Sequence, residues 1–172
     1  SNMLYSLMCA KKIITKESVI ISYADIFYSK RVIKKLFESN DDIVIAYDPN
    51  WLNLWEKRFI DPLDDAETFK IDQFSYLNEI GKKPKQIVDC EGQFMGLLKI
   101  TECGWSKIER IIADLEPKIK EIDTTFFLNY LIEEKIKIKA IPIDETWGEV
   151  DTYHDLKLYK KLLQTNYFSW MK

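Results

Sequence analysis

Residues 18–25, with the sequence SVIISYAD, constrain the fold more than any other stretch of this chain. Val19, Ile20 and Ile21 do not alternate with polar residues, which is typical of a strand covered on both faces of a mainly parallel sheet, and the run is too short for a buried helix. Asp25 stands where this strand ends. In open α/β sheets the ligand crevice lies at the carboxyl ends of the strands, so a carboxylate there suits a metal or a phosphate. A turn is the other interpretation of Asp25, and it is the simpler one for this residue taken alone.

A second buried strand follows one helix later. Ser29 is placed to cap a helix whose apolar residues share one face, and the strand predicted over 42–47, DIVIAY, stops at Asp48. Two such strands joined by one helix form a right-handed βαβ unit with parallel strands. Asp48 begins the sequence Asp-Pro-Asn, a turn signal strong enough to give this second acid a structural explanation.

The composition excludes several classes of protein. With 172 residues, 47% of them hydrophobic, the chain suffices for one domain, 1–172, with a full core. A formal net charge of −3 with interspersed Lys and Glu leaves no basic footprint, so we expect no nucleic-acid partner. No apolar run approaches a membrane span and nothing resembles a signal peptide, so a soluble cytoplasmic protein is expected. One histidine, His154, and three scattered cysteines disfavour a zinc site and a histidine-based triad.

The middle of the chain carries two features that bear on a ligand. Trp51 and Trp55 stand one helical turn apart ahead of an acidic loop, and the pattern over 67–80 predicts a pair of strands in a substrate-side hairpin or lid. Tryptophans at this spacing are also typical of a core. The strand predicted over 92–100 contains two glycines, which indicate either the close approach of a ligand or a bulge.

The remaining patterns predict elements that cover a sheet. They are helices over 2–14, 108–115 and 123–131, and an edge strand over 136–143 that is guarded by lysines. Near the C-terminus, Thr152 and Asp155 have the spacing of a reciprocal capping pair at a helix start. This pair leaves Glu149 and Asp151 in front of the helix without a capping role.

Four stretches of the chain, taken in order, resemble one known family. They are SVIISYADIFY (18–28), DDIVIAYD (41–48), GQFMGLLKIT (92–101) and TWGEVDTYHDLKLYKKLL (146–163). Together they look like the later part of the nucleotidyltransferase family of the nucleotide-diphospho-sugar transferase fold, closest to the cytidylyltransferases that activate phosphocholine or related phosphonates. The resemblance implies an α/β fold: a three-layer α/β/α sandwich around a mainly parallel, mixed, Rossmann-like sheet, truncated at its N-terminus.

The resemblance also implies a metal site. In that family an Asp at the end of a central strand and an Asp in a Glu-hydrophobic-Asp-Thr motif bind Mg²⁺, and the matching residues here are Asp25 and Asp151. An oxygen of a small phosphorylated acceptor attacks the α-phosphorus of a nucleoside triphosphate, and pyrophosphate leaves. Two carboxylates can hold a magnesium that offsets the charge building on phosphorus. Because the nucleophile is already ionised, no catalytic acid–base residue is assigned.

The same resemblance places the acceptor substrate beside two residues that open a strand, Gly92 and Gln93. Trp51 and Trp55 would then form an aromatic wall. Trp147 would add a further face, and aromatic faces of this kind favour a quaternary ammonium by cation–π attraction.

One element of the family is missing from this sequence. Family members begin with a strand and a glycine-rich loop carrying Arg and Lys, which bind the triphosphate and the base, whereas the five glycines here form no phosphate-cradling pattern. The chain then corresponds to the acceptor- and metal-binding part of a transferase, weak or inactive alone. The alternative is a non-catalytic remnant with an interaction or assembly role; a dinucleotide-binding oxidoreductase is disfavoured because its glycine fingerprint is missing. A central strand without its neighbour also favours self-association, so we expect a homo-oligomer.

Overall fold

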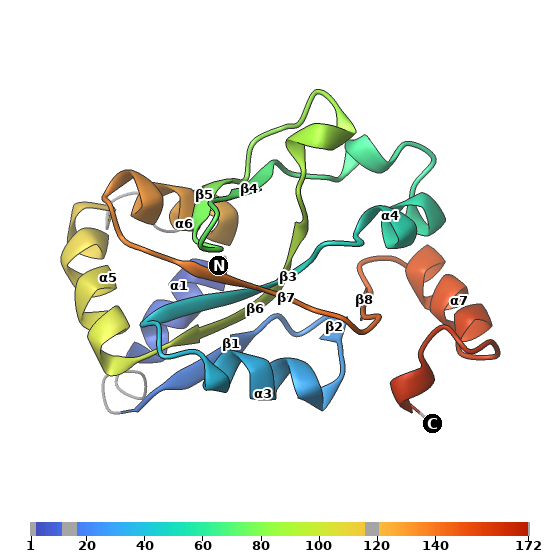
Figure 1. The fold of residues 1–172 in the computed structure, drawn as a ribbon, viewed down its shortest axis with the longest axis horizontal. Helices are drawn as coiled ribbons and strands as arrows, with labels where there is room; N and C mark the ends of the chain where they lie inside the picture. The colour runs from blue at the N-terminus through green and yellow to red at the C-terminus, as the bar shows by residue number, and fades with distance from the viewer. Residues whose placement is uncertain (1–2, 12–16, 116–120, 172) are drawn as a thin grey trace.

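The computed structural model describes residues 3–11, 17–115 and 121–171, and Figure 1 shows their arrangement. The helices are α1 (Met3–Cys9), α3 (Lys30–Glu38), α4 (Leu52–Arg58), α5 (Glu102–Leu115), α6 (Thr124–Glu133) and α7 (Tyr153–Leu162), with 3-10 turns η1 (Pro62–Asp64), η2 (Ile87–Asp89) and η4 (Ser169–Met171). The strands are β1 (Val19–Ser22), β2 (Ile26–Phe27), β3 (Ile43–Asp48), β4 (Phe69–Ile71), β5 (Leu77–Ile80), β6 (Gln93–Ile100), β7 (Lys139–Pro142) and β8 (Gly148–Glu149). The helix predicted over 2–14 is confirmed in α1, while residues 2 and 12–14 lie outside the described part of the chain.

Four strands form the central sheet in the order β1-β6-β3-β7. β6 is antiparallel to both β1 and β3, and β3 is parallel to β7, so β1, β3 and β7 run in one direction. The parallel relation predicted for the strand within 18–25 and the strand over 42–47 is confirmed in β1 and β3, but the two are not neighbours because β6 lies between them. β7 ends the strand order, as predicted for the strand over 136–143, but its outer side is partly covered, because Leu77 donates to the carbonyl of Ile138 and Ala140 donates to that of Ser75. The sheet is therefore mixed, with most of its strands parallel.

Side chains of β3 enter two hydrophobic layers. Ile43, Ile45 and Tyr47 belong to a cluster with residues of α1, α5 and α6, whereas Val44 and Ala46 belong to a second cluster with residues of α3, α4 and α7. Successive residues of a strand point to opposite faces, so helices cover both faces of the sheet. Figure 1 shows α5 and α6 together at the left and α4 and α7 together at the right. This covering confirms the three-layer α/β/α architecture.

The strand pair predicted over 67–80 is confirmed. β4 and β5 are antiparallel, with Phe69 opposite Ile80, and β5 packs against α6. The caps predicted at Ser29 and Thr152 are confirmed at the starts of α3 and α7, and Asp123 caps α6. The capping residues therefore fix where these three helices begin.

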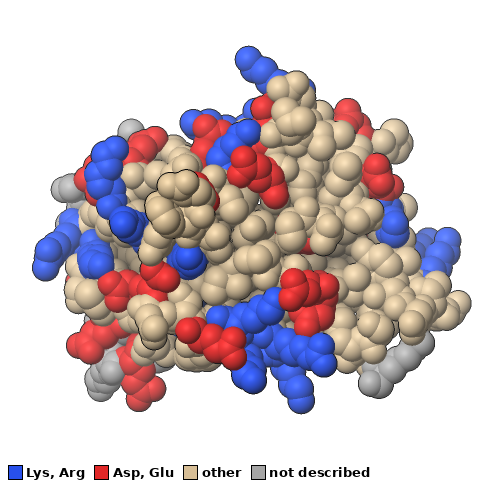
Figure 2. Space-filling model, viewed as in Figure 1, with Lys and Arg blue, Asp and Glu red and all other residues tan. Residues whose placement is uncertain are grey.

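Charged side chains of both signs share the surface. On the face drawn in Figure 2, acidic and basic side chains share the surface, and a group of basic side chains at the lower centre has acidic side chains on either side. Among the described residues, none of the helices combines the length and the apolarity that crossing a membrane requires.

A bulge in β6 lies where β1 ends. Between the pairs Ile45–Leu98 and Tyr47–Phe94 the register shifts, and Gly96 lies within this interval at a φ of 76°. The amide of Tyr23 donates to the carbonyl oxygen of Gly96 at 2.9 Å, and a Cβ added to Gly96 would lie 2.4 Å from the Tyr23 ring. The left-handed backbone and the close ring both require glycine here. The two glycines of this strand indicate either the close approach of a ligand or a bulge, and for Gly96 the bulge is the correct interpretation.

We predict that Gly96→Ala lowers the free energy of unfolding by about 2 kcal/mol, because alanine is strained at positive φ and its methyl group meets the Tyr23 ring. Urea denaturation followed by circular dichroism measures the loss. In the double variant with Tyr23→Ala the ring contact is relieved, so the combined cost should be smaller than the sum of the two single costs. An unchanged unfolding midpoint for Gly96→Ala would contradict this account.

Candidate functional site

A short two-stranded ladder brings together the two acids that the sequence singles out. β2 and β8 are antiparallel, with Ile26 opposite Glu149, and the amide of Val150 donates to the carbonyl oxygen of Asp25 at 2.9 Å. Asp151 is the next residue along the chain. Asp25 and Asp151 are both exposed. The turn after β1 and the connection before α7 therefore lie against each other, with a carboxylate on each.

A buried arginine at the end of α4 contacts the same connection. The side chain of Arg58 is 1% exposed and forms ion pairs with three carboxylates: Nη1 lies 3.0 Å from Glu149, Nη2 lies 2.6 Å from Asp151, and Nε lies 3.0 Å from Asp155. The guanidinium also lies over the ring of Trp55, 5.4 Å from its centroid. Arg58 thereby joins α4 to both ends of the segment that links β8 to α7.

The role of Arg58 is not predicted by the sequence. A run of acids at 149, 151 and 155 signals that a cation is needed once the segment is buried, because buried charges require partners. Nothing in the local pattern around Arg58 says that it is that cation, since more than ninety positions separate it from each of its partners.

The pKa values of two carboxyl groups in this cluster are shifted in opposite directions, upward for Glu149 and downward for Asp155. Burial, together with the negative charges of Asp151 and Asp25, raises the pKa of Glu149 to about 7 against the opposing effect of Arg58. Burial also acts on Asp155, but hydrogen bonds from Arg58 and Thr152 outweigh it and hold the pKa of Asp155 below its usual value. Asp155 is therefore ionised at neutral pH, whereas the pKa of Glu149 is close to neutral pH.

The donor set around Asp25 fits a divalent cation that is shared with a phosphate. No group of three or more His, Cys, Asp or Glu within the described residues has the arrangement to hold a metal alone. Mg²⁺ commonly takes only one or two carboxylates from the protein and completes its shell with water and substrate phosphates. Asp25 and Asp151 are hard, exposed oxygen donors on paired segments, which is the set that such an ion requires.

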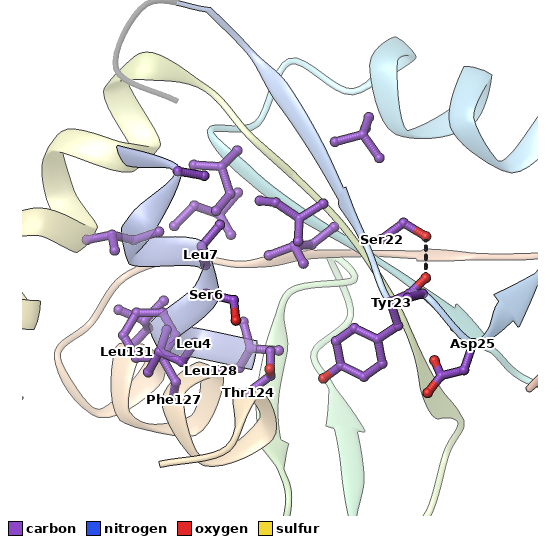
Figure 3. Close-up of a pocket in the computed structure, with 18 residues that line it drawn as sticks. Leu4, Ser6, Leu7, Ser22, Tyr23, Asp25, Thr124, Phe127, Leu128 and Leu131 are labelled. Carbon is purple, nitrogen blue, oxygen red and sulfur yellow. Dashed lines mark hydrogen bonds between the residues drawn. The ribbon is translucent and has the colours of Figure 1, made fainter. Parts of the chain in front are cut away.

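An apolar cavity of about 550 Å³ lies beside β1. Figure 3 shows Leu4, Leu7, Phe127 and Leu131 of α1 and α6 grouped at one end, and Asp25 at the other. Tyr23 also lines it, and burial raises the pKa of its hydroxyl to about 12, so the phenol is neutral. The candidate carboxylate thus stands at the polar end of an apolar cavity.

The aromatic residues predicted to contact the acceptor lie in the core. Trp51, Trp55 and Trp147 are 3%, 4% and 2% exposed. Trp51 Nε1 donates to the carbonyl oxygen of Cys90 at 3.1 Å, and Trp147 Nε1 donates to Asp48 at 2.9 Å. Trp55 packs beside the Trp147 ring. Burial and these contacts give the three side chains packing roles, so they do not belong to the proposed site.

The two predicted acceptor residues at the start of β6 also have structural contacts. The Gln93 side chain is 5% exposed, accepts from the amide of Glu67 at 3.2 Å and donates to its carbonyl oxygen at 2.6 Å. A Cβ on Gly92 would lie 2.4 Å from the Tyr47 ring. Gln93 therefore fastens the segment before β4, and Gly92 makes room for an aromatic ring.

Comparison with known proteins identifies the family. The chain is 35% identical over 170 residues to the CTP:phosphoglutamine cytidylyltransferase of Campylobacter jejuni subsp. jejuni serotype O:2, a match that covers 92% of this chain and 67% of that protein. The chain belongs to the cytidylyltransferases of the nucleotidyltransferase family. No family model matches this cytidylyltransferase chain.

Solved structures show the same fold for this family member. The inositol-1-phosphate CTP transferase from T. maritima superposes with a TM-score of 0.71 at 16% identity, over 96% of this chain and 62% of that one. A proposed glucose-1-phosphate thymidylyltransferase from Bacillus anthracis superposes with a TM-score of 0.69 at 13% identity, over 94% and 61%. The cytidylyltransferase chain thus spans about three fifths of the length of these structures.

We predict that Glu149→Gln stabilises the protein increasingly as the pH rises. The folded pKa of about 7 exceeds the unfolded value near 4.5, so the native state holds the extra proton between these values and loses the associated stability as the pH rises through 7. Glutamine stays neutral, so the variant should be more stable by roughly 1–3 kcal/mol at pH 8 and nearly unchanged at pH 4. Thermal melts across this range measure the difference.

The matched control for that series is Glu38→Gln, which removes an exposed carboxylate on α3. It should follow the unaltered chain at every pH. If Glu149→Gln and the unaltered chain kept a constant stability difference from pH 4 to pH 8, Glu149 would not titrate as described.

Proposed function

We propose that this chain is the acceptor- and metal-binding segment of a cytidylyltransferase. The reaction would transfer CMP from CTP to a small molecule bearing a phosphate or phosphonate, with release of pyrophosphate. The observation that carries the proposal is the pairing of the Asp25 turn with the segment before Asp151, found in a chain 35% identical to a CTP-dependent cytidylyltransferase. The named acceptors of the two CTP-dependent relatives, phosphoglutamine and inositol 1-phosphate, both carry phosphorus and support this acceptor class.

The proposed chemistry needs little proton transfer from the protein. An ionised phosphate or phosphonate oxygen forms a new bond to the α-phosphorus of CTP, the bond to the β-phosphate oxygen breaks, and pyrophosphate leaves as an anion. Asp25 and Asp151 present oxygens from two paired segments and would hold Mg²⁺ between them. When bound, Mg²⁺ supplies positive charge to the reacting phosphates and aligns them.

We predict that CTP with Mg²⁺ binds this chain in a calorimetric titration and that Asp25→Asn and Asp151→Asn each weaken binding by at least about 10-fold, because asparagine lacks the charge that offsets the metal's. Glu38→Gln is the matched control, because it removes an exposed carboxylate from α3, away from both segments. A titration of CTP with EDTA in place of Mg²⁺ should show no binding.

Two outcomes separate this proposal from its alternative. If binding appears and depends on both aspartates, release of pyrophosphate over phosphocholine, phosphonates and sugar phosphates then identifies the acceptor. Absence of Mg²⁺-dependent CTP binding would contradict the proposal for this chain and favour a non-catalytic remnant with an assembly role.

We also propose that the 172-residue chain self-associates. β1 pairs with β6 only on one side among the described strands, and the apolar cavity lies against its other side. An unpaired strand edge beside apolar surface favours association with a second copy. Light scattering from micromolar to near-millimolar concentration should show a mass that rises above that of one chain, and a constant monomer mass would contradict this.

A further inference from the structure

The three carboxylates that Arg58 contacts are of two kinds: one has both oxygens bonded, and the other two each give Arg58 a single oxygen. Both oxygens of Asp155 are occupied, Oδ1 by Arg58 Nε and Oδ2 by the amide and hydroxyl of Thr152. Asp155 is 3% exposed and is fixed by the capping box at the start of α7. This carboxylate is therefore an anchor that sets where the guanidinium lies.

The other two carboxylates each give Arg58 one oxygen. Nη1 bonds Glu149 Oε2 at 3.0 Å and Nη2 bonds Asp151 Oδ2 at 2.6 Å. Arg58 therefore bonds Oε2 of Glu149 and Oδ2 of Asp151 and does not use the second oxygen of either carboxylate. The Asp151 side chain is 44% exposed, so its second oxygen is open to solvent while the first is held. A planar guanidinium with a fixed fork of donors orients both carboxylates at once.

We propose that Arg58 is a positioning residue for a divalent cation bound by Asp25 and Asp151. Arg58 holds one oxygen of Asp151 from the buried side and leaves the other unused, on the segment whose Val150 amide bonds the Asp25 turn. The inference rests on the proposed metal site and adds the residue that orients it. Outer partners of this kind fix the orientation of metal-binding side chains, and their loss commonly lowers metal affinity by about 10–100-fold.

A purely electrostatic role makes the opposite prediction. A positive charge next to the site repels a cation, so removing it while three carboxylates remain would strengthen cation binding if charge alone mattered. Removing an orienting partner weakens binding even though the site becomes more negative. The sign of the change in affinity therefore separates the two roles.

The experiment titrates Mn²⁺ alone into the whole chain and follows free Mn²⁺ by electron paramagnetic resonance. Arg58→Lys keeps the charge but lacks the planar fork of donors that orients the carboxylates, and Arg58→Gln removes the charge. Positioning predicts that both variants bind Mn²⁺ about 10-fold or more weakly than the unaltered chain. Lys57→Gln, which removes an exposed charge from the same helix, should leave the affinity within about two-fold.

The outcomes distinguish this inference from the proposed function. Equal or tighter Mn²⁺ binding in Arg58→Lys and Arg58→Gln, with loss in Asp151→Asn, would overturn the positioning role and leave the metal site standing. Absence of Mn²⁺ binding by the unaltered chain would overturn the inference, whereas the proposed function is judged by the CTP titration, in which phosphates complete the shell of the metal. Circular dichroism and thermal melts report whether each variant folds. If Arg58→Gln does not fold, Arg58→Lys alone decides, since it retains the charge that the buried carboxylates need.

Discussion

A guanidinium that water cannot reach must be balanced by charges of the chain itself, and this requirement shapes the functional end of the molecule. Arg58 meets it with carboxylates that lie on either side of the start of α7. The ion pairs hold α4 against the segment that follows β8, and β8 in turn pairs with β2 beyond the end of β1. The placement of Asp25 beside Asp151 thus depends on an electrostatic contact outside the main sheet.

The features that could be predicted from the sequence depend on neighbouring residues. Val19 to Ile21 and the strand ending at Asp48 are apolar runs with turn residues after them, and Ser29 and Thr152 cap helices through contacts within three positions. The family resemblance added the pairing of Asp25 with Asp151, which no local pattern contains. The insertion of β6 between β1 and β3 and the partners of Arg58 were not predicted, because both are set by contacts between distant segments.

The tryptophans show how one pattern can support two interpretations. Trp51 and Trp55 at helical spacing suit either a ligand wall or a core, and burial decides for the core. The indole of Trp51 bonds the backbone at Cys90, while Trp55 contacts both Trp147 and the Arg58 guanidinium. Their large apolar faces therefore help to exclude water from the ion pairs. A guanidinium is weakly hydrated and is attracted to the face of an aromatic ring, so burying Arg58 beside Trp55 costs less free energy than burying a lysine would.

The order of the strands has a consequence for how the chain acquires its structure. Val19 of β1 pairs with Ile100 of β6, so β1 is synthesised well before its hydrogen-bonding partner in the described sheet. Pairings between positions so far apart in sequence are slow to form because loop-closure entropy is lost before they contribute. On the ribosome, the apolar strand at Val19 to Ile21 therefore stays without its partner until β6 has emerged, an interval in which a chaperone has the opportunity to bind.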